Sequence, residues 1–485
     1  MSDASHLPAL ERYAQKQPEF LPGDAAAATG LSLHEIRTGL EELMKKYECR
    51  LQVTDKGQLV YRFGRRKGSR TTKEMIAELS EKAYKVFTVV FKFCIAAFLL
   101  AYFVLFLVIL IAIIVISIAS IFSSDGDGGD IDVDVGGAFF ILGDIFRAIF
   151  IWDMMSAETY YHTDERGYRY RKYKPKPSRM HLRKKQKGKK VGEPKKSFVY
   201  SVYDYVFGEA RYQPHEKANE REVAAFLRTH KGIITPREVL SLNGLSKSAY
   251  EKLFSESLIQ FEGKPEVSRE GVLYGDFGEL TQQVSDTKDA DVVYYWNEYE
   301  AAYELTGNSS GRNILITFLN GFNLVFGWLG ITGFFNTVFG MPHAAWLPIA
   351  LGWVPFVFSL VFFCIPMIRY VRLQPLRRQR HQTNIRKRVM RTIFESEAEY
   401  MSLPEIREAT NLQAKSEEPL TEKQVAEVME ELAYDLEAEM SIREADAAMV
   451  YDFRPLRREE REAARLRAER GNASDRGAIV FDTQE

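Results

Sequence analysis

Cysteine is scarce in this chain of 485 residues. Only Cys49, Cys94 and Cys364 are present, and they lie far apart, with no CxxC pair and no Cys/His cluster. A disulfide framework needs several cysteines, and a zinc or iron–sulfur site needs clustered ligands. The sequence therefore predicts no metal site and no cofactor.

Enzyme motifs are also absent. The chain has no GxxxxGK[ST], no GxGxxG between a strand and a helix, no HExxH and no GxSxG, and its eight histidines are scattered. No residue is nominated as catalytic, and we expect a protein that is not an enzyme.

Net charge is nearly absent too, at −1, but this average hides a strong segregation of apolar and charged residues. Residues 93–122 carry no charge, and as a helix they would reach about 45 Å, longer than the roughly 30 Å hydrocarbon core of a bilayer. Residues 314–339 and 346–368 are similar, and the short link GMPHAA would fold them into an antiparallel hairpin. These runs predict an integral membrane protein.

A fourth apolar stretch, AFFILGDIFRAIFIW at 138–152, is short. Asp144 and Arg147 fall three apart, on one helical face, where they could pair inside a bundle or at the membrane surface. Whether this stretch crosses the membrane or lies on it decides the topology of the chain.

Basic residues indicate that it crosses. They gather at 62–70, 166–196 and 369–391, and the positive-inside rule places all three segments in the cytoplasm. Four crossings are then required, with both termini cytoplasmic and the acidic loop 123–136 outside. The first twenty residues show no signal-peptide pattern, so we expect the inner (cytoplasmic) membrane as location.

A pattern recurs three times outside these runs, beginning at Leu21, Ile233 and Leu403. In the first two copies a helix ends at Gly-Leu-Ser, where Ser32 or Ser246 begins a second helix as N-cap, and a hairpin follows. A further helix precedes each copy. Helix, helix-turn-helix and hairpin is the order of a winged helix.

Winged helices bind either DNA or protein, and the charge of the second helix helps to distinguish the two. This helix is of mixed sign in copy one, SLHEIRTGLEELMKKY, and strongly acidic in copy three, EKQVAEVMEELAYDLEAEM, where it would repel phosphate. Only Arg37, Lys45, Lys46, Lys247 and Lys252 could support DNA contact. Protein interaction is the favoured use, and DNA the less favoured one.

The basic stretch after the fourth apolar run is rich in tyrosine, and an aromatic segment, FVYSVYDYVFG, follows it. Basic residues beside a membrane crossing suit anionic lipid headgroups better than nucleic acid. Equally, the stretch could bind no ligand and serve only to set the orientation of the chain in the membrane. The candidate lipid-binding residues are Arg169, Arg171, Lys172, Lys174, Arg183, Lys184 and Lys185.

Polar and small residues mark the run 314–339. Small residues allow close packing of helices in a membrane, and amides can bond across them. The candidate packing residues are Asn320, Asn323, Gly327, Gly330 and Gly333. The alternative is a solute pathway, which with four spans would require an oligomeric transporter or channel.

Three stretches together resemble an uncharacterised family of polytopic membrane proteins of bacteria and plastids. They are the hairpin strand DKGQLVYRFG, the juxtamembrane segment SFVYSVYDYVFGEA and the second hairpin strand REGVLYGDFGEL. The resemblance implies a membrane protein with winged-helix-like cytosolic domains, and it implies no activity.

The expected fold class is a mainly α membrane protein with about four transmembrane helices and three small α+β winged-helix-like domains. We expect a membrane scaffold or sensor that presents these domains for protein–protein interaction; a membrane-tethered DNA-binding regulator and an oligomeric transporter or channel are the alternatives. Expected partners are the bilayer, anionic lipid headgroups, an unknown protein and a second copy of the chain. The expected segments are winged-helix-like domains at 1–65, 211–282 and 371–458 (the last with its basic arm), membrane regions at 66–153 and 313–370, a juxtamembrane segment at 154–210, a helical linker at 283–312 and a charged tail at 459–485.

Overall fold

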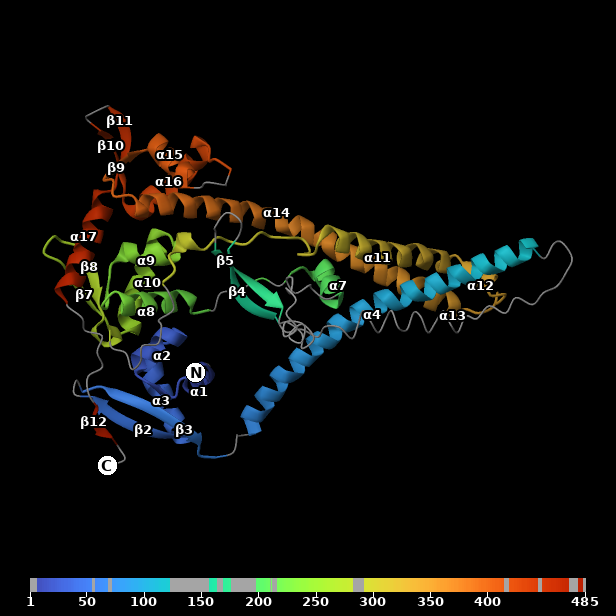
Figure 1. Ribbon diagram of the computed structural model, residues 1–485, viewed down its shortest axis with the longest axis horizontal. Helices are drawn as coiled ribbons and strands as arrows, with labels where there is room; N and C mark the ends of the chain where they lie inside the picture. Colours follow the sequence, from blue (N-terminus) through green and yellow to red (C-terminus); the bar gives the residue numbers. More distant parts are fainter. Residues whose placement is uncertain are drawn as a thin grey trace, which may run out of the picture.

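The computed structural model is mainly helical, with several small sheets (Figure 1). Three of its helices are long and apolar enough to cross a membrane. The mainly α fold class is therefore confirmed, and the three helices are compatible with a membrane location by length and composition. The expected fourth span 138–152 and the loop 123–136 lie outside the described residues. The structure describes residues 7–54, 57–68, 72–122, 157–163, 169–175, 198–209, 211, 216–281, 292–413, 418–443, 447–470 and 479–482.

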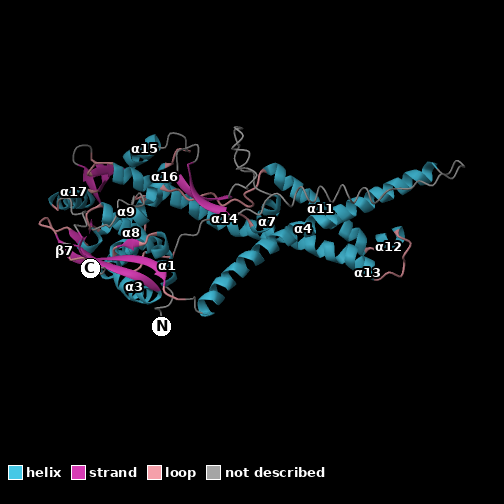
Figure 2. Cartoon of the chain, turned by 60° about the horizontal axis from the view of Figure 1, so that its bottom comes forward, coloured by secondary structure: helices cyan, strands magenta, loops and turns pink. Residues whose placement is uncertain are grey.

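The apolar helices form one end of the molecule, where Figure 2 shows helices and no strands around α12 and α13. They are α4 (Thr72–Phe122), α11 (Ser310–Ile331), α12 (Phe334–Val338), α13 (Trp346–Pro348) and α14 (Val354–Glu395), with a π-helical turn at Ile349–Trp353. The run 314–339 was expected to be one helix. It is broken at Gly333, whose φ of 81° lies in the left-handed region that favours glycine.

The first of three small units lies at the N-terminus and consists of three helices and a small sheet. Its elements are α1 (Leu7–Lys16), β1 (Glu19–Phe20), α2 (Pro22–Thr29), α3 (Leu33–Lys46), β2 (Tyr47–Thr54) and β3 (Leu59–Arg66). Gly30 ends α2 in the left-handed conformation, and the Ser32 hydroxyl accepts from the backbone N–H of Glu35 at the start of α3. Both local predictions are confirmed.

The second and third units have the same order of elements. The second contains α8 (Ala218–Thr229), β6 (Ile233–Ile234), α9 (Pro236–Asn243), α10 (Lys247–Gln260), β7 (Lys264–Val267) and β8 (Leu273–Asp276). The third contains the end of α14, β9 (Tyr400–Ser402), α15 (Leu403–Gln413), α16 (Glu422–Leu436), β10 (Glu439–Arg443) and β11 (Ala448–Asp452). In each unit the last strand lies in the middle of three, as in β1-β3-β2, β6-β8-β7 and β9-β11-β10.

The sequence suggested a separate first helix for the third unit. In the structure this helix is the end of α14. This helix runs unbroken for 42 residues from the apolar hairpin through the basic segment into the third unit (Figure 1). At 1.5 Å per residue it is about 63 Å long. Its last turns bury Ile385, Val389 and Ile393 in the core of the units.

The segment 459–485, expected as a charged tail, contains regular structure. Helix α17 (Arg454–Glu469) contacts the second unit, and β12 (Ile479–Asp482) pairs antiparallel with β2 of the first unit. The three units also share one hydrophobic core, which includes Leu40, Phe254, Met429 and Leu456. Burying one such side chain contributes about 1.5–3 kcal/mol, so the units form a single body.

Two smaller elements lie between the ends of the molecule. Helix α7 (Phe198–Phe207) packs Val202 and Val206 against α4, α11 and α14. Strands β4 (Ala157–Thr163) and β5 (Arg169–Pro175) form an antiparallel hairpin. Of the proposed lipid-binding residues, Arg169, Arg171, Lys172 and Lys174 belong to β5, and Arg183, Lys184 and Lys185 lie outside the described residues.

Candidate functional site

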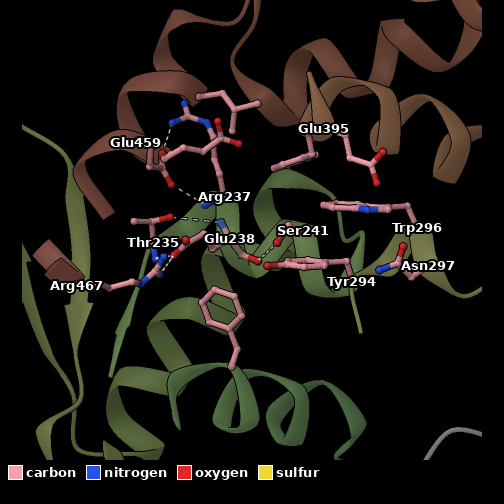
Figure 3. A pocket seen from close by; sticks show the side chains of 14 residues that line it. Thr235, Arg237, Glu238, Ser241, Tyr294, Trp296, Asn297, Glu395, Glu459 and Arg467 are labelled. Atoms are coloured by element: carbon pink, nitrogen blue, oxygen red, sulfur yellow. Dashed lines mark hydrogen bonds and ion pairs between the residues drawn. The ribbon is translucent and has the colours of Figure 1, made fainter. Parts of the chain in front are cut away.

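A cavity of about 500 Å³ opens at the junction of the second unit, the third unit and α17 (Figure 3). Its lining comes from α8, from α9 and its N-cap, from the segment 294–297, from the last turn of α14 and from α17. Ligand cavities in proteins typically measure about 300–1,000 Å³ and occur preferentially between domains. We therefore take this cavity as the candidate site.

One wall of the cavity is aromatic. The ring of Trp296 stacks on Tyr294 with centroids 5.0 Å apart and on Phe394 of α14 with centroids 4.8 Å apart. A hydrogen bond fixes this wall to α14: Lys387 Nζ donates to the backbone carbonyl of Glu298 over 2.5 Å. The segment that carries Trp296 is thus held against α14.

The same segment was expected to be a helical linker, 283–312. Over 292–309 it has one 3₁₀ turn (Tyr295–Asn297) and is otherwise irregular or extended, and its last three residues already belong to α11. Basic side chains of α14 bind its backbone carbonyls: Arg380 Nε donates to Glu300 over 2.7 Å and Arg377 Nε to Tyr303 over 2.8 Å. The basic face of α14 therefore holds this segment through backbone groups, and no helix is needed.

The opposite wall is charged. Arg237 of α9 forms an ion pair with Glu459 of α17, and only 11% and 8% of these side chains are exposed. Arg467 of α17 donates to Glu238 of α9 over 2.6 Å, and Figure 3 shows both pairs beside Thr235. The pairs hold α17 against α9 from two positions.

Carboxylates from outside the second unit bind the N-termini of two of its helices, α9 and α10. The backbone N–H of Arg237 at the start of α9 donates to Glu459 over 2.9 Å, and that of Lys247 at the start of α10 donates to Asp435 of α16 over 2.7 Å. Helix N-termini leave N–H groups free and favour negative charge. Ser246 was expected to cap α10; it occupies the N-cap position, but its side chain makes no capping hydrogen bond, because Asp435 takes that role.

Glu437 follows α16 in the left-handed region, at φ 54°, where glycine is the favoured residue. Its carboxylate pairs with Arg237 and with Lys247, each over 2.5 Å. The side chain therefore accounts for a residue other than glycine at this position.

The carboxylates of the junction differ in pKa. Burial raises the pKa of Glu459 and of Glu460 above the ordinary value, and the neighbouring arginines only partly oppose this rise. By contrast, the hydrogen bond from Lys247 holds the pKa of Glu437 below its ordinary value. The exposed fractions of these side chains also differ: 48% for Glu437, 35% for Glu460 and only 8% for Glu459.

The proposed packing residues of α11 lie at a second place, between the apolar helices. Asn320 Nδ2 donates to the Ser359 carbonyl of α14 over 3.0 Å, and Asn323 Nδ2 to the Leu99 carbonyl of α4 over 2.9 Å. A Cβ on Gly327 would lie 2.9 Å from the Phe356 nitrogen. A Cβ on Gly330 would meet Leu351, whereas a Cβ on Gly333 would have no neighbour within 4 Å.

Neither Tyr294–Asn297 nor α17 was nominated from the sequence. The aromatic run VVYYWNEY was a visible signal, because so many rings in a short segment predict burial. Nothing local marked Glu459, which is one of many acids in an acidic and basic helix. Comparisons with protein-family models, curated proteins and solved structures found no match to this chain.

Proposed function

We propose that the protein is an integral membrane scaffold or sensor that holds three winged-helix-like domains at the cytoplasmic face, where they bind one another and a protein partner. The observation that carries this proposal is the continuity of α14. One helix is apolar at one end and, at the other, buried in the third unit and against the segment 294–297. A displacement of the apolar helices is then transmitted to the units without an intervening flexible joint.

The recurrence of one order of elements supports the winged-helix assignment. Each unit has a helix, a short strand, two further helices and a hairpin, and its last strand lies between the other two. This is the arrangement by which a winged helix joins its hairpin to the short first strand.

The shared core supports four crossings. Residues that precede α4, residues between α4 and α11, and residues that follow α14 are all buried together, for example Leu40, Phe254 and Met429. All three units must then lie on one side of the membrane, so a return crossing is needed between α4 and α7. After replacement of the three cysteines, an impermeant maleimide should label Ser124→Cys in intact cells and leave Ser178→Cys unlabelled; labelling of Ser178→Cys would contradict the count.

The second helices of the second and third units, α10 and α16, support protein interaction over DNA binding. The start of α10 is occupied by α16, where Tyr250 also donates its hydroxyl to the Asp435 carbonyl over 2.9 Å. The outer face of α16 exposes Glu427, Glu430 and Glu431, which phosphate would avoid. Both helices are thus unsuited to a DNA groove.

The hairpin of the third unit offers a surface for a protein partner. Ile442 pairs with Met449 across the hairpin, so their side chains share a face with Met440, and the three are 68%, 63% and 63% exposed. Exposed apolar side chains grouped on one face are typical of interaction sites.

A photo-crosslinking residue at Ile442, in the full chain in its membrane, tests the proposal. We expect a discrete protein adduct from position 442 and none from Lys423, whose side chain is 86% exposed on the adjacent helix. DNA adducts at both positions, or a sequence-specific footprint that persists at moderate salt, would instead support the DNA-binding regulator.

A further inference from the structure

More carboxylates than guanidinium groups line the junction cavity. Four glutamates and two arginines line it, and both arginines are paired with Glu459 and Glu238 of the lining itself. The other two carboxylates, Glu395 and Glu460, have partners outside the lining: Arg391 over 2.9 Å and Arg457 over 2.7 Å. All four carboxylates thus have an arginine partner, but Glu395 and Glu460 remain 41% and 35% exposed, so their oxygen atoms can accept further hydrogen bonds.

Polar groups of the aromatic wall are available as well. Trp296 is 5% exposed, yet its indole N–H donates to no described residue, and the Tyr294 hydroxyl has no described partner either. Aromatic faces beside carboxylates are the surroundings in which proteins bind organic cations. The wall is thus suited to a flat or apolar body that carries positive charge.

A side chain of the protein already uses this chemistry in the same cavity. The Arg467 guanidinium lies 5.3 Å from the centroid of the Phe226 ring and donates to Glu238. It also donates to the Ile233 carbonyl over 2.8 Å, so an aromatic face, a carboxylate and a carbonyl together hold this cation.

A metal ion does not fit the lining. Within the described residues no group of three or more His, Cys, Asp or Glu side chains is placed to hold one. The volume of about 500 Å³ is also many times the roughly 30 Å³ that one water occupies. The space suits an organic molecule.

We propose that this cavity binds a small organic cation, a primary amine or guanidinium on an apolar body, with its charge beside Glu395 and Glu460 and its body against Tyr294 and the edge of the Trp296 ring. The proposal rests on the scaffold or sensor function above. A ligand in this place contacts α14, the segment 294–297 and α17 together, so it stabilises the docked units and gives the sensor its input.

Calorimetric titration of the full chain in nanodiscs tests this, with tryptamine as the probe, indole-3-acetate as its anionic counterpart and empty nanodiscs as the blank. Tryptamine should bind at one site per chain, and indole-3-acetate should not bind. Glu460→Gln should weaken tryptamine binding about tenfold, because a hydrogen bond to a charged group contributes about 1.5–3 kcal/mol. The variant keeps the fold, since Arg457 Nε also donates to the Ala398 carbonyl over 3.2 Å.

Glu397→Gln is the matched control. It removes the same charge two residues from Glu395, at an exposed position outside the cavity, and should bind like the unchanged protein. Equal binding of both probes, or an equal loss in both variants, would overturn the proposal.

Hydrogen exchange separates this proposal from the scaffold function. Saturating tryptamine should slow exchange in α17 and at the end of α14. If tryptamine does not bind but position 442 still gives its protein adduct, the ligand proposal is refuted and the scaffold function stands. If the adduct is absent, the scaffold function itself is refuted.

Discussion

The contact of α11 with α14 and the contact of α9 with α17 join helices by opposite means. In the first, glycines bring the backbones together: a Cβ on Gly327 would lie 2.9 Å from the Phe356 nitrogen of α14, and one on Gly330 would overlap the Leu351 carbonyl in the π-helical turn before α14. In the second, the backbones stand apart and the long side chains of Arg237 and Glu459 fill the space. One contact uses neutral amides such as Asn320, and the other uses charges.

The surroundings explain this difference. Between apolar helices the hydrophobic effect gives no drive to associate, so stability comes from close packing and from amides that bond carbonyls. At the junction of the units water is nearby, and a partly desolvated ion pair is tolerated when hydrogen bonds satisfy it. Glu459 is satisfied by the Arg237 guanidinium and by its backbone N–H.

Arg237→Ala should have the largest effect on this comparison. It leaves Glu459 buried without its ion pair, which costs about 3–5 kcal/mol. We expect protease cleavage between α16 and α17 of the reconstituted chain, at a protease concentration that leaves the unchanged protein intact. Arg461→Ala, which removes a surface pair with Glu399 at an arginine 69% exposed, is the control and should change stability by about 0–1 kcal/mol. Equal sensitivity of the two variants would mean that the junction does not depend on its buried pair.

Gly330→Ala should come next, because the added methyl group has no space beside Leu351. Overpacking of this kind costs about 1–3 kcal/mol, and unfolding by sodium dodecyl sulfate in mixed micelles would measure it. Gly321→Ala on the same helix is the control, since a Cβ there has no neighbour within 4 Å. It should be neutral or slightly stabilising, as alanine favours helix; a similar loss in both variants would contradict close packing at Gly330.

Asn320→Leu should have a smaller effect. The substitution removes the bond to the Ser359 carbonyl but also removes an Oδ1 atom that is buried without a partner. Such bonds contribute about 0.6 kcal/mol on average between membrane helices. The same micelle titration would detect the change, whereas Asn320→Asp should cost about 2.5–3.5 kcal/mol because it introduces a charge. If Asn320→Leu lowered stability as much as Arg237→Ala, the α11–α14 contact would depend on its hydrogen bond as strongly as the α9–α17 contact depends on its ion pair.

Acid should produce the smallest change, at the exposed pair Lys247–Glu437. The hydrogen bond from Lys247 lowers the pKa of Glu437. The pair therefore stabilises the fold at pH values above the ordinary pKa of glutamate, and this stabilisation is lost as the pH falls through the lowered pKa. Hydrogen exchange at the start of α10 should therefore rise modestly below about pH 4. Glu437→Gln should remove this pH dependence; if it persists, another group is responsible.

Local signals predicted much of the fold. Gly30 and Gly244 end helices because only glycine enters the left-handed region without strain, and the information lies in the residue itself. The apolar runs predicted three helices by length alone. The third unit was misjudged at its start, because nothing in the basic segment of α14 distinguishes an extended membrane helix from a separate one.

The candidate site was beyond local signals. Asp435 replaced the expected Ser246 at α10 from 188 residues away, and Glu459 reaches α9 across 222 residues. Many acids of this chain could fill either role on the evidence of sequence alone, since any carboxylate suits a helix N-terminus.

The sequence by itself determined most of the helices, hairpins and apolar spans, because caps, periodicity and run length depend on neighbouring residues. Only the tertiary structure decided which distant segments meet: β12 pairs with β2, and Gln52 donates to Asp482 across 430 residues. The physical reason is that closing a longer loop costs little more than closing a shorter one. The choice of partner therefore depends on the packing of the whole molecule, which no single segment encodes.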